Sequence, residues 1–200
     1  MKNLFNSLLI LTAMSITIAC TNSNTASDDQ DSTGIMDHSM TADSMGTSSD
    51  RASATISSVK ADTSGSGKVE FVKKNDNMVE MSLTVNFPKM ANKSVAVHFH
   101  EHGDCSDEGK GAHGHWNPTN EPHGKWGSST HHSGDIGNIE LDAQGNGSIT
   151  VSSDRWTIGG DDKTNVVNRA VIVHSGVDDY KTQPTGNAGS RIGCGVITAL

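Results

Sequence analysis

Histidine dominates the part of this chain that could do chemistry. Six histidines and one aspartate fall in a spacing typical of metal ligands: His98, His100, His115, His123, His132, Asp135 and His174. His98 and His100 alternate in an apolar run, and residues i and i+2 of a strand point to the same face, so both imidazoles can reach one ion. Three imidazoles with a carboxylate suit zinc, and four imidazoles with an open position suit copper. The pattern therefore predicts two metal ions.

Short strands must position these ligands. Alternating apolar and polar residues, separated by Gly, Asp and Asn, predict eight strands, and no long helical periodicity is present. The expected strands cover residues 54–60, 67–73, 78–87, 94–101, 136–142, 147–153, 169–174 and 192–200. This number of short strands predicts an all-β fold, a barrel or a sandwich.

Two long segments, 102–135 and 175–191, do not follow the strand pattern. Both are rich in Gly and polar residues, and both lie beside the candidate ligands. Loops of this length are uncommon unless they are functional. A loop without a core needs another source of order, which a metal ion or a disulfide supplies. We therefore expect two long functional loops.

The N-terminus has the features of an export signal. Lys2 is followed by an apolar run at residues 8–11, which is too short to span a membrane, and Ala19 precedes Cys20. This pattern predicts that residues 1–19 are a lipoprotein signal peptide and that Cys20 is acylated. The alternative is a secreted protein with a free Cys20.

Residues 20–52 are rich in Ser, Thr, Asp and Asn, a composition that cannot bury a core. We expect them to be a disordered tether to a domain at 53–200. Met36, His38 and Met40 carry thioether and imidazole groups, which are copper ligands. They are either a weak copper-collecting arm or a chance cluster in a linker.

Charge and cysteine content narrow the class of protein. The net charge of −8 becomes −9 once the signal peptide and Lys2 are removed, which disfavours nucleic acid as a partner. An anionic substrate would need a locally positive site. If Cys20 carries lipid, Cys105 and Cys194 remain as a pair, and in an exported protein such a pair predicts a disulfide.

Several motifs together resemble the copper/zinc superoxide dismutases, in their bacterial, exported lipoprotein form. The resemblance covers residues 53–200 and implies a Greek-key β-barrel of eight strands. The motifs are His98-Phe99-His100-Glu101, Gly114-His115-Trp116-Asn117-Pro118, His132-Ser133-Gly134-Asp135-Ile136-Gly137-Asn138, Val173-His174 and Gly186-Asn187-Ala188-Gly189-Ser190-Arg191-Ile192-Gly193-Cys194-Gly195.

The resemblance implies a role for each matching residue. One copper ion would be bound by His98, His100, His115 and His174. One zinc ion would be bound by His115, His123, His132 and Asp135, so that His115 is a shared imidazolate. His132 is preferred over His131 because only His132 fits the His-x-x-Asp spacing. Asp178 would orient ligands of both metals, Arg191 would be the cation beside copper, and Cys105–Cys194 would be the family disulfide.

The implied activity is the dismutation of superoxide to dioxygen and hydrogen peroxide by copper that cycles between Cu(II) and Cu(I). His115 would carry a proton to product, and Arg191 would guide the anion. The competing hypothesis is a non-enzymatic, extracytoplasmic copper-buffering module on the same fold. In either case we expect a periplasmic or cell-envelope protein held to a membrane through Cys20, and the resemblance allows a homodimer.

Overall fold

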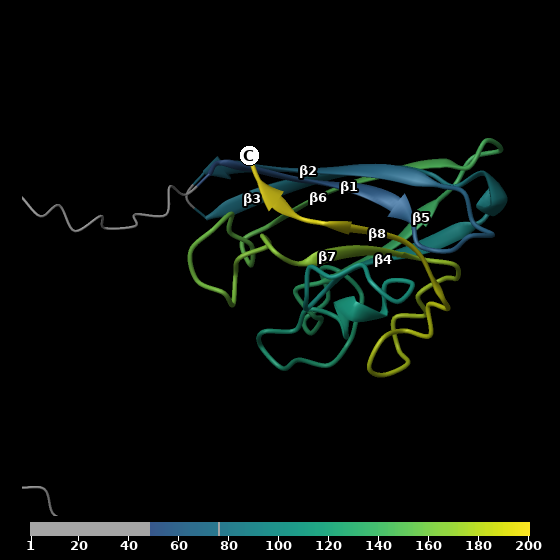
Figure 1. Cartoon of the computed structure of the whole chain (residues 1–200). Helices are drawn as coiled ribbons and strands as arrows, with labels where there is room; N and C mark the ends of the chain where they lie inside the picture. The colour runs from purple at the N-terminus through teal and green to yellow at the C-terminus, as the bar shows by residue number, and fades with distance from the viewer. Residues whose placement is uncertain (1–48, 76) are drawn as a thin grey trace, which may run out of the picture. The chain divides into compact units, whose positions relative to one another are not determined.

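The computed structural model describes residues 49–75 and 77–200, which form an antiparallel β-barrel (Figure 1). The expected signal peptide, Cys20 and the Met36/His38/Met40 cluster lie outside these residues. The strands of this part are β1 (Arg51–Ser58), β2 (Ser66–Asn75), β3 (Met78–Asn86), β4 (Ser94–His100), β5 (Asp135–Glu140), β6 (Asn146–Ser153), β7 (Ala170–His174), β8 (Arg191–Val196) and β9 (Thr198–Ala199). Its helical elements are two 3₁₀ turns, η1 (Pro88–Met90) and η2 (Lys110–Ala112).

The strands follow the order β5-β4-β7-β8-β1-β2-β3-β6, and β9 pairs with β1 outside that path. The two end strands, β5 and β6, contact each other, so the sheet is nearly closed into a barrel. Around it, β4, β5 and β6 follow one another, and β7 returns by a long connection to lie beside β4. This order is a Greek key, and it confirms the predicted all-β class.

The strands differ from the sequence prediction in three details. β1 begins at Arg51, two residues before the predicted domain boundary. The expected final strand is divided into β8 and β9 at Ile197, because this fully buried residue exchanges backbone hydrogen bonds with Asn168 and Arg169 instead. β5 ends at Glu140, two residues before the predicted end of that strand, and β6 pairs with β3 along its whole length.

The core consists of the inward-facing residues of the alternating strands. In β3 every second residue is buried from Val79 to Val85, which is the pattern of a strand with one face on the core. The rings of Phe71, Phe99 and Trp156 pack with centroids 5.2–6.2 Å apart. β4 is buried over nearly its whole length, so its histidines lie on a rigid element.

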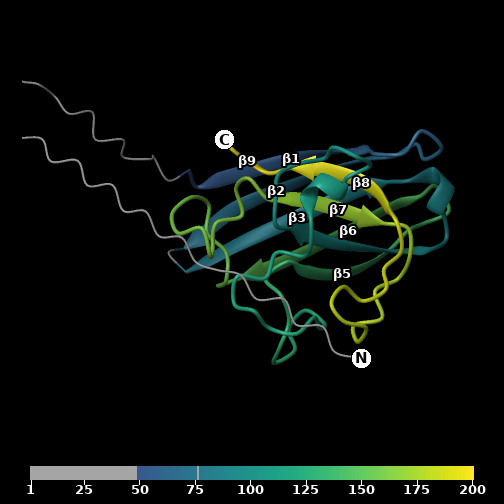
Figure 2. The same ribbon diagram turned by 60° about the horizontal axis from the view of Figure 1, so that its bottom comes forward.

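Two long loops run between β4 and β5 (residues 101–134) and between β7 and β8 (residues 175–190). Both lie on the same side of the barrel, beside β4 and β7 (Figures 1 and 2). The Cys105–Cys194 disulfide joins the first loop to β8 with a Cα–Cα distance of 5.8 Å. A third long connection, residues 154–169, was not singled out in the sequence. It carries Trp156, whose indole N–H donates to the carbonyl of Ser133 at 2.9 Å.

Candidate metal centre

Two groups of buried ligands lie where the loops meet β4 and β7. Within each group, the candidate ligand atoms all lie within 4.8 Å of one another. The first group contains His98, His100, His115 and His174, and the second contains His115, His123, His132 and Asp135. β4 supplies two ligands of the first group and the end of β7 supplies His174, because these strands are paired. A short antiparallel bridge to His100 brings His115 to the same place.

One oxygen of Asp135 is the centre of the second group. Its Oδ1 lies 2.8 Å from Nδ1 of His115, 3.0 Å from Nδ1 of His123 and 3.2 Å from Nδ1 of His132. The other oxygen, Oδ2, accepts backbone N–H groups of Gly124 at 3.1 Å and His132 at 2.8 Å. The carboxylate is therefore fixed by the backbone and presents its free oxygen to three imidazoles.

His115 belongs to both groups. Its Nδ1 faces Asp135, while its Nε2 is buried and has no hydrogen-bond partner. Its ring lies 4.0 Å from the ring of His98 and 5.1 Å from that of His100, centroid to centroid. One imidazole therefore presents one nitrogen to each group.

Asp178 connects the two groups from the second loop. Its two oxygens accept hydrogen bonds of 2.9 Å each from Nε2 of His98 and Nε2 of His123. This leaves Nδ1 of both rings free for a metal ion. Asn138 of β5 holds Asp178 in turn, with its amide bonded to the backbone N–H and carbonyl of Asp178 at 2.8 and 2.9 Å.

Four imidazole nitrogens in these groups are buried without a hydrogen bond, namely Nδ1 of His98, Nε2 of His115, Nδ1 of His123 and Nδ1 of His132. Burying an unpaired polar atom is costly, and native proteins rarely leave such atoms unsatisfied. All four point into the two ligand groups. The residues present therefore fit two metal ions, one in each group.

Burial keeps four of these imidazoles in the neutral form that binds a metal ion. Burial lowers the pKa of His98, His100 and His174, and it lowers the pKa of His115 to about 4. These four rings are therefore neutral at pH 7, as a metal ligand must be.

His123 behaves differently. Burial lowers its pKa, but the contacts with Asp135 and Asp178 outweigh burial and raise the pKa to about 9. Burial likewise raises the pKa of both carboxyls, yet their imidazole partners hold them well below the usual range. In the metal-free chain, His123 carries a proton that a metal ion at the second group must displace.

Arg191 lies half-buried at the start of β8. Its guanidinium donates to the backbone carbonyls of Gly109 and His113. The His113 carbonyl also accepts a hydrogen bond of 2.9 Å from Nδ1 of His100. Arg191 thus shares an acceptor with a ligand of the first group, and its positive charge adds to the lowering of the pKa of His100 that burial begins.

The structure brings together the seven residues that the sequence marked as ligands of the two ions, while Met36, His38 and Met40 lie outside the described residues. His131 is buried outside both groups, with its ring against Trp126, and His132 lies in the second group. Sequence reasoning missed the supports: the His113 carbonyl, Asn138, and Gln183, whose amide makes two hydrogen bonds of 2.9 Å to the backbone of His123. Of these, Asn138 could have been found from the sequence, because it is the last residue of the motif that begins at His132.

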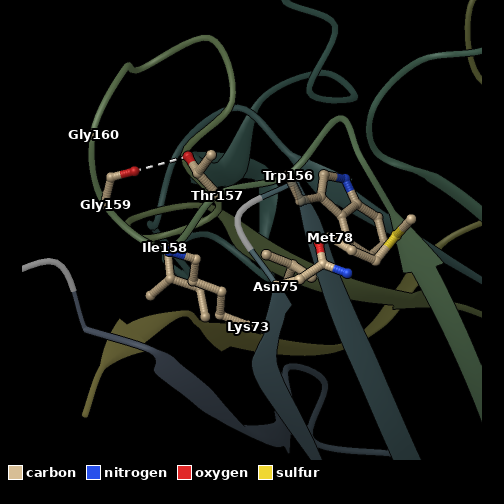
Figure 3. A pocket seen from close by; sticks show the side chains of 9 residues that line it. Lys73, Asn75, Met78, Trp156, Thr157, Ile158, Gly159 and Gly160 are labelled. Carbon is tan, nitrogen blue, oxygen red and sulfur yellow. Dashed lines mark hydrogen bonds between the residues drawn. The ribbon is translucent and has the colours of Figure 1, made fainter.

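A separate pocket with a volume of about 190 Å³ lies away from these groups (Figure 3). Met78 and Trp156 line it together with the loop from Thr157 to Gly160, where the Thr157 hydroxyl donates to the carbonyl of Gly159 at 2.8 Å. Neither metal group contributes a residue to it. The candidate metal ligands therefore lie in the two histidine groups and not in this pocket.

Known proteins that resemble this chain include enzymes that are named for copper and zinc. The family model for copper/zinc superoxide dismutase (SODC) matches residues 65–197. The chain is 37% identical over 135 residues to superoxide dismutase [Cu-Zn] 2 of Aquifex aeolicus, covering 66% of this chain and 78% of that protein. It is 34% identical over 151 residues to superoxide dismutase [Cu-Zn] of Botryotinia fuckeliana, covering 71% and 95%.

The chain belongs to the copper/zinc superoxide dismutase family. Among solved structures, the clock protein EA4 matches with a TM-score of 0.66 and 30% identity, covering 77% of this chain and 97% of that one. The enzyme converts superoxide to dioxygen and hydrogen peroxide, with one copper and one zinc ion per chain. The family match does not favour the hypothesis of a non-enzymatic copper-buffering module.

Proposed function

We propose that superoxide dismutation takes place at the first ligand group. Copper would be held by His98, His100, His115 and His174, and zinc by His115, His123, His132 and Asp135. The observation that carries this proposal is the buried, unpaired Nε2 of His115, whose Nδ1 is already committed to the Asp135 group. A ring in this position can join two different ions and belong to both.

The reaction consumes two superoxide anions and two protons and gives one dioxygen and one hydrogen peroxide. Copper, when bound, supplies the one-electron oxidation and reduction, and zinc has no redox role. His115 handles a proton at Nε2, because the Asp135 group occupies its Nδ1. Burial holds this ring in its neutral form in the metal-free chain, with a pKa of about 4, so its Nε2 is free either for a metal ion or for the proton that it transfers.

Arg191 provides positive charge at the site. The chain as a whole is acidic, with a net charge of −8, so its general field repels superoxide. The guanidinium remains protonated at all physiological pH values and lies beside the first group. We assign it the attraction and hydrogen bonding of the anion. Lys181 is the only lysine in residues 175–190, so little other positive charge is available in that loop.

Anomalous diffraction from crystals of the fully loaded enzyme, recorded at the copper and zinc absorption edges, tests the assignment. The copper signal is expected among His98, His100 and His174, and the zinc signal beside Asp135. The His115 ring should lie between the two ions. The assignment is wrong if that ring contacts one ion only, or if the two edges exchange places in a sample whose superoxide consumption is intact.

Export and anchoring are a second part of this proposal. The segment at residues 1–19 and the position of Cys20 support a lipoprotein whose tether, predicted to cover residues 20–52, leads to the barrel predicted at 53–200. Because β1 begins at Arg51, the tether ends by residue 50. Among the described residues, no helix is long and apolar enough to cross a membrane. An acylated Cys20 would supply the attachment instead, and would place the enzyme in the periplasm or cell envelope.

Metabolic labelling with a radioactive or alkyne fatty acid tests this part in a bacterial host. The wild-type chain should carry label and sediment with membranes, whereas Cys20→Ser should carry none and remain in the soluble fraction. The Cys105→Ser variant serves as the control, because its cysteine lies in the folded domain. Equal labelling of the wild-type and Cys20→Ser chains would contradict acylation at Cys20.

A further inference from the structure

A third cluster of ligand side chains lies at the surface, where the backbone of β4 continues past His100. Glu101 N–H donates to the carbonyl of Gly114 at 3.1 Å, and His102 N–H donates to that of Ala112 at 3.3 Å. This pairing continues the bridge between His100 and His115 outward. It places the side chains of His102 and His113 together, with ring centroids 4.6 Å apart.

Glu101, His102 and His113 each offer one ligand atom, and these three atoms lie within 4.8 Å of one another. Both imidazoles are exposed and the glutamate is half-buried. Within residues 49–75 and 77–200, none of the three side chains makes a hydrogen bond or an ion pair. The cluster shares no residue with the two buried groups.

We propose that Glu101, His102 and His113 form a third metal site, which takes a divalent transition-metal ion from solvent. Two imidazoles and one carboxylate are a known protein ligand set for zinc, with the remaining position open to water. The order of affinities for nitrogen and oxygen ligands places Cu(II) above Zn(II). The exposure of both imidazoles makes the site accessible to free ions while the buried groups remain filled.

The backbone holds this site in shape. The carbonyl of His113 accepts hydrogen bonds from Nδ1 of His100 and from the Arg191 guanidinium. His113 itself has a φ of 62°, a left-handed conformation that costs energy for most residues. These bonds fix the backbone of His113 despite that cost, so the position from which its ring extends is set before an ion arrives, and less conformational entropy is lost on binding. The carboxylate of Asp104 lies near enough to act on both imidazoles and adds negative charge beside the cluster.

The test uses the full chain with both buried groups already filled, and adds Cu(II) or, separately, Zn(II) as the probe. Equilibrium dialysis with elemental analysis should find one more equivalent of Cu(II) on the wild-type enzyme than on a His102→Gln/His113→Asn variant. Asn is chosen at 113 because it tolerates a positive φ. Glu101→Gln should weaken binding of this extra ion at least tenfold, and Zn(II) should bind more weakly than Cu(II). A Cu(II) electron paramagnetic resonance signal separate from that of the buried copper should accompany the extra ion.

Two controls make the outcome decisive. Asp154→Asn removes an exposed carboxylate elsewhere and should leave the extra equivalent in place. His38→Gln removes the histidine of the N-terminal arm, a competing location for the same ion. The proposal is wrong if the double variant binds as much Cu(II) as the wild type, or if His38→Gln alone abolishes the extra equivalent. Because the metal content of the buried groups is measured in every sample, a failure here is separate from a failure of the assigned catalytic site.

Discussion

At the scale of single residues, the chemistry rests on how each imidazole divides its two nitrogens. One nitrogen of His98 and one of His123 bond to Asp178, and one nitrogen of His100 bonds to the His113 carbonyl. The opposite nitrogen of each ring then faces a ligand group. Such partners fix the tautomer and the orientation of a ligand before metal binds. His115 is the exception, because both of its nitrogens are directed at ligand groups.

Replacement of Arg191 by alanine should lower superoxide consumption about tenfold or more, because the local positive charge that attracts the anion is lost. Activity of the wild type should fall with rising ionic strength, and activity of the variant should respond less. Copper and zinc content should stay the same, since Arg191 is not in either ligand group. Lys163→Ala, which removes one exposed positive charge outside the metal centre, is the matched control. Identical activities of wild type and Arg191→Ala at all ionic strengths would reject the guiding role.

Replacement of Asp178 by asparagine should weaken binding of both metals, by about 10- to 100-fold each, because one carboxylate supports a ligand in each group. Competition with a coloured chelator measures both affinities. Asp179→Asn changes the adjacent carboxylate, whose hydrogen bonds within the described part of the chain go to residues 181 and 182 of its own loop, and it should leave both affinities unchanged. An effect confined to one metal would contradict the bridging role.

At the scale of elements, the barrel provides rigid strands and the loops complete the site. β4 and β7 are buried paired strands and supply His98, His100 and His174. The loop at residues 101–134 lacks a core of its own, and three kinds of contact hold it in place. The Trp156 indole donates to the Ser133 carbonyl, imidazoles of the loop contact Asp135, and the disulfide joins the loop to β8. Loss of any one should loosen the loop more than the barrel.

The Cys105→Ala/Cys194→Ala variant tests the disulfide. A bond that closes a loop of this length is expected to contribute about 4–5 kcal/mol to the free energy of unfolding in the chain-entropy model. Urea titration of the metal-free enzyme should show a lower midpoint for the variant. Reduction of the wild type with dithiothreitol should give the same shift and should not change the variant. A midpoint that neither treatment alters would show that the bond contributes nothing to stability.

At the scale of the whole molecule, the fold buries a set of ionisable groups that only metal ions fully satisfy. The four imidazoles with lowered pKa values are neutral in the folded chain, and His123 is protonated. The number of protons bound by the metal-free protein therefore differs between its folded and unfolded states, both below and above the ordinary pKa of histidine. Its stability must depend on pH in a way that the loaded enzyme does not share.

The stability of the metal-free enzyme should be highest near about pH 6.5, the ordinary pKa of histidine. Below pH 6.5 the unfolded chain binds protons that the buried neutral imidazoles of the folded chain refuse until about pH 4, the pKa of His115, so stability falls with acid. Above pH 6.5 the unfolded chain has lost its histidine protons, while folded His123 keeps the proton that pairs with Asp135 and Asp178. Stability therefore falls as the pH rises to about 9, the pKa of His123, and this group causes no further fall above it.

Thermal unfolding of the metal-free enzyme from pH 4.5 to pH 10 measures this dependence. The midpoint should decline on both sides of a maximum near about pH 6.5, and His123→Gln should remove only the decline between that pH and about pH 9. The copper- and zinc-loaded enzyme is the control and should change less between pH 5 and pH 7. A midpoint that is constant from pH 4.5 to pH 7 would contradict the burial of neutral imidazoles.

Local patterns in the sequence predicted the strands to within a few residues, the two loops and the candidate ligands, because alternation along a strand and the spacing of His and Asp are local properties. His98 and His100 could be placed on one face from their spacing alone. The His-x-x-Asp spacing led us to prefer His132 over His131, and in the structure His132 is the one of the two that lies in a ligand group.

Which atoms meet could not be predicted in this way, because it depends on the tertiary structure. The two nitrogens of His115, the bridge through Asp178 and the shared carbonyl of His113 depend on contacts between segments far apart in the chain, which no local pattern specifies. The division of the last strand at Ile197 and the pairing of His102 with His113 have the same origin. Local residue types set which groups can bind, and the packing of β4, β7 and the loops set which of them do so together.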